Sequence, residues 1–238
     1  MNDYRDLLSR LTEPFGVEIS PELWEKFAIY GDLLKEWNEK INLTAITEDN
    51  EITVKHFADS LTALKFMSVK NGTTLADIGT GAGFPGLPLK IAAPGLNVTL
   101  VDSLEKRLNF LETVISELGL TGITTVHARA EDFGRNPAFR DSFDYATARA
   151  VAAMPVLLEY CMPAVKKGGC FLALKGSRDE GEFKRAAALL SARPVRTEEF
   201  TIQNGGELLE RKIYIFEKTD RTAKAYPRKA GTPGKNPL

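Results

Sequence analysis

Residues Asp77 to Gly86 read Asp-Ile-Gly-Thr-Gly-Ala-Gly-Phe-Pro-Gly, the most informative segment of the chain for its fold. The run Thr74–Ala76 before it predicts a strand, and Leu87–Ile91 after it predicts a helix. Glycine has no Cβ, so a turn built from glycines lets a ligand approach the backbone closely. A strand, a glycine-rich turn and a helix are the first part of a nucleotide-binding α/β unit.

An acidic residue follows at the spacing that a ribose requires. The next predicted strand, Asn97–Val101, ends at Asp102, nineteen residues after Gly83. A carboxylate at this point can accept hydrogen bonds from both hydroxyls of a ribose. The turn and Asp102 together predict a cofactor that contains adenosine.

The glycine spacing favours S-adenosylmethionine over a dinucleotide. Gly79, Gly81 and Gly83 follow at intervals of two residues, whereas the dinucleotide fingerprint is Gly-x-Gly-x-x-Gly. Pro85 has no N–H group to offer a pyrophosphate. The Asp77 carboxylate would repel a pyrophosphate but suits the ammonium and sulfonium groups of S-adenosylmethionine. The alternative is an ordinary strand–helix turn in which Asp77 caps the helix.

Composition and length are those of a globular protein. The chain has 238 residues, 43% of them hydrophobic and 26% charged, which suffices for one α/β domain with an extension. No apolar run reaches the length of a membrane span, and the polar N-terminus lacks a signal-peptide core. The two cysteines, Cys161 and Cys170, have no metal-binding spacing. We expect a cytoplasmic monomer without a membrane segment, a metal or a disulfide.

Charge is distributed unevenly along the chain. Lys218–Leu238 contains six basic residues and one acidic residue, a net charge of +5, so the other residues carry −6 of the total of −1. A basic, Pro/Gly-rich tail is typical of an arm that binds nucleic acid, although solvated tails are also common. The candidate RNA-binding residues are Arg221, Lys224, Arg228, Lys229 and Lys235. The alternative is that Tyr226 and the prolines pack the tail onto the body.

Three parts follow one another along the chain. Residues 1–70 read as helical, with Ser20 capping a helix whose apolar stripe we expect in the core, and a further helix over 51–66. Residues 71–217 alternate strands and helices and end in a hairpin. Residues 218–238 form the tail. This order predicts a class I, Rossmann-like methyltransferase fold: a mostly parallel seven-stranded sheet closed by a C-terminal β-hairpin, with an N-terminal helical extension.

The ends of the predicted strands define one polar rim, where ligands of such sheets bind. The predicted strands are 74–78, 97–102, 123–127, 143–147 and 169–174, and the predicted helices are 85–93, 104–119, 152–163 and 179–192. Glu131 or Asp132, after the third strand, can accept a hydrogen bond from the adenine amino group, or else cap a helix. Because this rim lies between Asp77 and Arg178, we expect cofactor affinity to survive removal of the tail after Glu217.

Arg149 is the candidate catalytic residue, because it follows at the end of the fourth predicted strand, 143–147, where a methyltransferase holds its acceptor. It can bind the cofactor carboxylate, a phosphate or the O6/N7 edge of a guanine. Both cysteines fall inside predicted elements, which excludes a covalent mechanism, and we expect no histidine at the rim. Guanine N7 has a lone pair and no proton, so its methylation needs positioning and electrostatics but no base. Other acceptors also fit this pattern.

Motifs in order along nearly the whole chain resemble those of the RsmG (glucose-inhibited division protein B) family. They are Trp37–Thr44, His56–Leu61, Asp77–Gly86, Arg129–Glu131, Thr147–Ala150, Lys175–Gly176 and Tyr226–Pro233. The resemblance implies transfer of a methyl group from S-adenosylmethionine to N7 of a guanine in the decoding region of 16S rRNA. The implied partner is 16S rRNA or the small ribosomal subunit. The resemblance also implies cofactor contacts from Gly79, Phe84, Ala130, Glu131 and Arg149, to which the residue patterns above add Asp77, Gly81 and Asp102.

Other classes of protein stay open at this point. A methyltransferase of another RNA or of a small molecule would share the cofactor rim. A non-catalytic RNA-binding protein can retain the fold, although an intact rim argues against it. A dinucleotide-dependent oxidoreductase is disfavoured by the glycine spacing and by Pro85.

Overall fold

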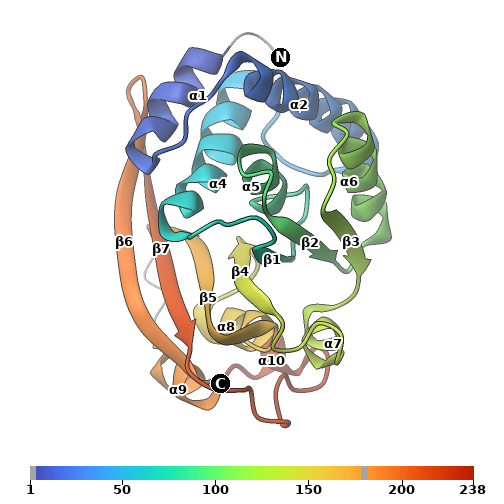
Figure 1. Ribbon diagram of the computed structural model, residues 1–238, viewed down its shortest axis with the longest axis vertical. Coiled ribbons are helices and arrows are strands. Elements are labelled where there is room, and N and C mark those ends of the chain that lie inside the picture. The colour runs from blue at the N-terminus through green and yellow to red at the C-terminus, as the bar shows by residue number, and fades with distance from the viewer. Residues whose placement is uncertain (1–3, 178–181) are drawn as a thin grey trace.

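The computed structural model describes residues 4–177 and 182–238, and these form a three-layer α/β fold (Figure 1). The strands are β1 Thr74–Ile78, β2 Asn97–Asp102, β3 Ile123–His127, β4 Phe143–Arg149, β5 Val165–Gly176, β6 Ala192–Asn204 and β7 Glu207–Lys218. They form one seven-stranded sheet in the order β3-β2-β1-β4-β5-β7-β6. Strands β1 to β5 pair in parallel, whereas β7 is antiparallel to both β5 and β6. The predicted fold class and its closing hairpin are confirmed.

Helices cover both faces of the sheet. They are α1 Arg5–Thr12, η1 Glu13–Phe15, α2 Pro21–Ile41, α3 Asp49–Glu51, η2 Ile52–Ala58, α4 Asp59–Leu61, η3 Thr62–Phe66, α5 Gly86–Ala92, α6 Glu105–Glu117, α7 Ala130–Arg135, α8 Met154–Cys161, α9 Lys184–Leu189 and α10 Thr232–Lys235. The Ser20 side chain accepts the Leu23 N–H and begins α2, as predicted. The helix expected over 51–66 is divided into short pieces, with a π-helical stretch at η2. The start of the helix predicted at 179 lies outside the described residues.

Two apolar cores lie on opposite faces of the sheet. In Figure 1, α1, α2, α5 and α6 lie above the strands, and α7, α8 and α9 lie below them. Phe27 and Tyr30 of α2 are fully buried and belong to the same cluster as Leu75 and Leu100 of the sheet. The aromatic stripe is therefore core, as predicted. The N-terminal helices and the sheet share this core, while the division of the chain at residues 70 and 217 stays a prediction.

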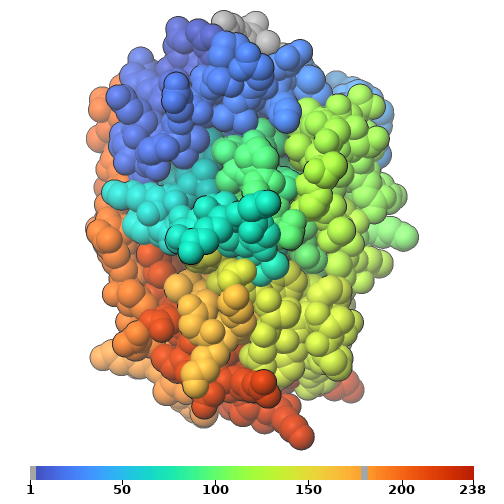
Figure 2. Space-filling view, viewed as in Figure 1, coloured from blue at the N-terminus to red at the C-terminus, as the bar shows by residue number. Residues whose placement is uncertain are grey.

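The C-terminal segment packs against the body of the protein. Figure 2 shows it, in red, over the lower end of the molecule. Tyr226 and Leu238 pack against the apolar cluster below the sheet. In the described parts of the chain, no helix has both the length and the apolar character that a membrane crossing needs.

Candidate active site

The glycine-rich turn after β1 is shaped by its neighbours in space. Gly79, Gly81 and Gly83 have φ values of 73°, 60° and 98°, which side chains rarely adopt. A Cβ on Gly83 would lie 2.7 Å from the Tyr30 hydroxyl oxygen. That hydroxyl donates a hydrogen bond to the Ala82 carbonyl, so helix α2 holds the turn from outside. The local sequence makes the turn possible, and the N-terminal extension fixes it.

Asp77 is fully buried beneath this turn. Its carboxylate accepts the Gly86 N–H and the Thr147 hydroxyl, each at 2.9 Å, and burial raises its pKa. Gly86 is the first residue of α5. The side chain therefore links β1, β4 and the start of α5, which agrees with the alternative that Asp77 caps the helix. This corrects the expected contact between Asp77 and the charged groups of the cofactor.

A first cavity of about 350 Å³ opens over the ends of β1, β2 and β3. It brings together four of the expected cofactor residues, Gly79, Asp102, Ala130 and Glu131. Asp102 is only 3% exposed, and its carboxylate accepts the N–H groups of Gly81 and Leu104, each at 2.9 Å. Gly81 therefore contributes by way of Asp102 and does not line the cavity itself. The other expected cofactor residues, Phe84 and Arg149, lie elsewhere.

A second cavity, of about 690 Å³, adjoins the first. Its polar wall comes from Lys55, His56 and Asp59 of the N-terminal extension, Arg149 of β4, Lys175 of β5 and Arg211 of β7. Ala150, directly after β4, lines both cavities and has a φ of 56°. The two cavities therefore meet at the end of β4.

Arg149 is at the centre of the polar network in this wall. Its guanidinium donates to Asp59 at 2.8 Å and to the Lys55 carbonyl at 3.1 Å. It also lies 4.8 Å from the centroid of the Phe84 ring. The second oxygen of Asp59 accepts Arg211 Nε at 2.9 Å. One buried carboxylate therefore joins two arginines from strands β4 and β7.

His56 lies in the same wall, so the expectation of no histidine at the rim is wrong. Arg149 donates to its Nδ1 at 3.1 Å, and because a guanidinium can only donate, Nδ1 is the acceptor. The proton of the neutral ring is then on Nε2, which donates to the Thr44 hydroxyl at 2.9 Å. Burial and the charge of Arg149 lower the pKa of His56 to about 3. The ring is therefore neutral near pH 7.

Most residues in the wall of the second cavity were not predicted from the sequence. His56 and Asp59 belong to the motif His56–Leu61, which supported the family resemblance without any role being assigned to it. Lys55 and Arg211 belong to no motif. A histidine and an aspartate three residues apart were the one available signal.

The tail residues expected to bind RNA fall into two groups. Lys224, Lys229, Lys235 and Arg221 are exposed. Arg228 instead donates to the buried Glu159 carboxylate through Nε at 2.9 Å and Nη2 at 2.7 Å. This corrects the expected role of Arg228, because its guanidinium is bound to α8.

The tail also reaches the first cavity. Gly231 lines that cavity, and its N–H donates to Glu131 at 2.7 Å. The expectation that the rim is complete between Asp77 and Arg178 is therefore wrong. The last twenty residues of the chain contribute to it.

Comparison with known proteins assigns the chain to a family. The family described as "GidB: rRNA small subunit methyltransferase G" matches residues 23–213, most of the chain. The chain belongs to the GidB family. A GidB-family protein from Desulfitobacterium hafniense named "Ribosomal RNA small subunit methyltransferase G" is 56% identical over 99% of this chain and 98% of its own length. A Lactococcus lactis protein of the same name is 47% identical over 98% of both chains.

Solved structures share the fold of this GidB-family chain at low sequence identity. YcgJ from Bacillus subtilis superposes with a TM-score of 0.56 at 15% identity, covering 69% of this chain and all of YcgJ. TYW2 from M. jannaschii, solved in complex with AdoMet, gives a TM-score of 0.50 at 15% identity, covering 63% of this chain and 71% of TYW2. At this identity the likeness concerns the fold alone.

Proposed function

We propose that this protein transfers a methyl group from S-adenosylmethionine to N7 of a guanine in the decoding region of 16S rRNA. The observation that carries the proposal is the pair of adjoining cavities that meet at Ala150. One cavity has the carboxylates that an adenosine requires, and the other has the cations that a nucleic acid requires. The names of the relatives, which specify small-subunit ribosomal RNA, support this substrate class.

The first cavity fits S-adenosylmethionine, which supplies an activated methyl group on a sulfonium. Asp102 would bind the ribose hydroxyls, because a carboxylate accepts from both of them. Glu131 would accept the adenine amino group, with Ala130 beside the ring. The Gly79 backbone borders the cavity at a point where a Cβ would lie 2.7 Å from Val151, so a side chain there would crowd the site. AdoMet bound to TYW2, which has a similar fold, supports this choice.

The second cavity fits a nucleotide of RNA. Four cations, Lys55, Arg149, Lys175 and Arg211, line it against two acids, Asp59 and Glu210. This excess of positive charge favours phosphate groups. The His56 ring lines the same wall and stacks on the buried Phe84 ring, with their centroids 4.3 Å apart.

The residues of the second cavity position the acceptor and have no part in removing a proton. His56 is neutral, and its Nδ1 accepts a hydrogen bond from Arg149. The ring therefore offers no free base near pH 7. Guanine N7 presents a lone pair, so in-line attack on the methyl group requires no base. Arg149 would act as a positioning residue that fixes the wall and stabilises negative charge on the RNA.

Methylation of ribosomal RNA by the purified protein tests the proposal. The protein would be incubated with 16S rRNA or with small ribosomal subunits and S-adenosylmethionine labelled on the methyl group. N7-methylguanosine would then be located by borohydride and aniline cleavage, which breaks the chain at that base. We expect one methylated site, in the decoding region. We also propose that the protein acts in the cytoplasm as a monomer. Label on adenine, on another RNA alone or on no RNA would overturn the proposal.

A further inference from the structure

The C-terminal segment Thr219–Leu238 follows β7, and one of its residues, Gly231, lines the first cavity. We propose that this segment, called here the strap, completes the cofactor site, and that Arg228 and Gly231 are positioning residues for Glu131. The inference rests on the proposed binding of S-adenosylmethionine in that cavity. Nothing in the local sequence of the strap indicates a cofactor role.

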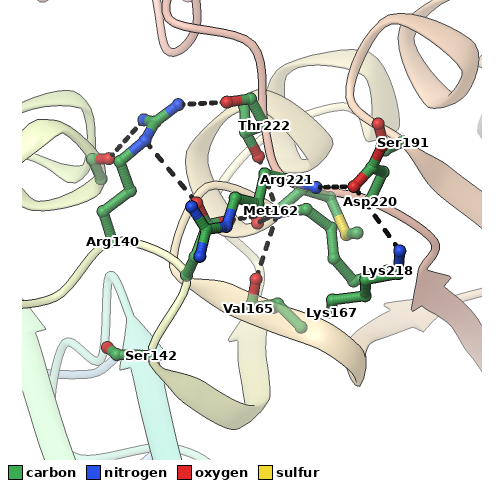
Figure 3. A network of polar contacts seen from close by, with 12 residues as sticks. Arg140, Ser142, Met162, Val165, Lys167, Ser191, Lys218, Asp220, Arg221 and Thr222 are labelled. Atoms are coloured by element: carbon green, nitrogen blue, oxygen red, sulfur yellow. Dashed lines mark hydrogen bonds and ion pairs between the residues drawn. The ribbon is translucent and has the colours of Figure 1, made fainter.

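The start of the strap is fixed by a buried lysine. Lys218 is fully buried, and its ammonium donates to the carbonyl of Met162, to the Val165 carbonyl at 3.1 Å and to the Thr222 hydroxyl at 2.6 Å. It also pairs with Asp141 at 3.1 Å. Figure 3 shows Lys218, Met162, Val165 and Thr222 gathered where the strap leaves β7. A buried ammonium needs such partners, so this point of the strap is tied to the body.

Arg140 holds the next few residues through their backbone. Its guanidinium donates to the Thr222 carbonyl at 2.7 Å (Figure 3). It also donates to the carbonyls of Ala223 at 3.1 Å and Tyr226 at 2.9 Å. Arg135 adds a hydrogen bond to the Pro227 carbonyl at 2.8 Å. Two arginines on or after α7 therefore fix the path of the strap as far as residue 227.

Arg228 is the anchor nearest to the cavity. The Glu159 carboxylate on α8 is fully buried, and it accepts the backbone N–H of Arg228 at 2.7 Å as well as the guanidinium. A buried carboxylate is stable only when it is paired, so the Glu159 carboxylate fixes the position of Arg228. Gly231 is the third residue after Arg228, a reach of about 10 Å at most. The position of Gly231 therefore depends on Arg228.

Gly231 acts on Glu131, which is 3% exposed. The N–H of Gly231 donates to one carboxylate oxygen at 2.7 Å, across 100 residues of sequence. Within the described ranges, the second oxygen has no hydrogen-bond partner, and Glu131 borders the cavity. Gly231 itself has a φ of 81°, which a glycine adopts without strain. The strap thus holds Glu131 in one orientation and leaves an acceptor for the adenine amino group.

The test compares two ligands on three full-length proteins by calorimetry. S-adenosylhomocysteine carries the adenine amino group, and S-inosylhomocysteine carries a carbonyl in its place. We expect wild type to bind the adenosyl ligand more tightly. In Arg228→Ala the affinity for the adenosyl ligand should fall about tenfold or more, while the affinity for the inosyl ligand changes little, because one charged hydrogen bond is lost. If Arg228 had a purely structural role, the substitution would lower the affinity for both ligands equally.

Lys229→Ala is the matched control, since it removes the same charge from the next residue, which is exposed. We expect it to bind both ligands as wild type does. If Arg228→Ala is unfolded at the assay temperature, Arg228→Lys takes its place and should show a smaller loss of discrimination. If wild type discriminates and the Arg228 variants do so equally well, the inference is wrong and the proposed function stands. If wild type binds neither ligand, the proposed function fails, and the inference fails with it.

Discussion

His56 stacks on Phe84, with their ring centroids 4.3 Å apart and their planes at 23°. The histidine comes from the π-helical stretch of the N-terminal extension, and the phenylalanine comes from the glycine-rich turn. Arg149 lies over the same phenyl ring, so the buried Phe84 supports two residues, His56 and Arg149, that line the second cavity. The N-terminal extension is therefore part of the candidate acceptor site.

The buried state of His56 predicts a pH dependence of stability. Its pKa is about 3 in the folded protein and about 6.5 when exposed. Since the depressed pKa reflects a ring that is held neutral, the associated stability is present above pH 6.5 and is lost as the pH falls toward 3. Between pH 7 and pH 5 we expect a loss of about 2 kcal/mol in the free energy of unfolding, measured by denaturant titration.

Variants of the two histidines isolate this effect. His56→Asn should flatten the difference between pH 7 and pH 5 by that amount. His127→Asn should retain it, because His127 is exposed. The same pH dependence in wild type and His56→Asn would show that the buried ring is not its source.

Gly79→Leu should abolish binding of S-adenosylhomocysteine, as measured by calorimetry. The new Cβ would lie 2.7 Å from Val151, at the border of the first cavity. Gly16→Leu is the control, because its φ of 74° matches the 73° of Gly79 and a Cβ there meets no atom within 4 Å. Both variants carry about 1–2 kcal/mol of backbone strain, but only the first should lose the ligand. Equal affinity in Gly79→Leu and wild type would exclude the first cavity as the cofactor site.

Arg149→Ala should lower the turnover number by at least about tenfold, or about 1.4 kcal/mol in transition-state free energy. It should also lower the free energy of unfolding by about 1–3 kcal/mol, because buried Asp59 loses one of its two arginines. Arg149→Lys keeps the charge but loses the planar fork, so it should regain more stability than turnover. Complete methylation by Arg149→Ala at limiting enzyme concentration would refute the role.

The exposed lysines of the strap should contribute to RNA affinity. Changing Lys224, Lys229 and Lys235 together to Gln should lower the slope of log affinity against log salt concentration by about 2–3, if each contacts a phosphate. Cofactor affinity should not change, because none of the three lines the first cavity. The control changes Lys26, Lys40 and Lys70 to Gln in the same way. An unchanged slope in the strap variant would remove these lysines from the RNA-binding surface.

The parallel core of the sheet and the position of the glycine-rich turn could be predicted from the amino-acid sequence alone. Strands β1, β2 and β3 have the predicted bounds, and Gly79 and Asp102 border the first cavity as expected. These features are local, because consecutive apolar residues predict a buried strand and glycines predict a turn with positive φ.

The contacts of Asp77, His56 and Arg228 join distant parts of the chain and could not be predicted from the sequence. Asp77 meets the Thr147 hydroxyl across 70 residues, Arg149 meets Asp59 across 90, and Gly231 meets Glu131 across 100. Such contacts leave no periodic pattern, because each joins one donor to one acceptor brought together by the folding of whole layers. For the same reason the net charge of the tail could be counted from the sequence, whereas the pairing of Arg228 with buried Glu159 could not be predicted from it.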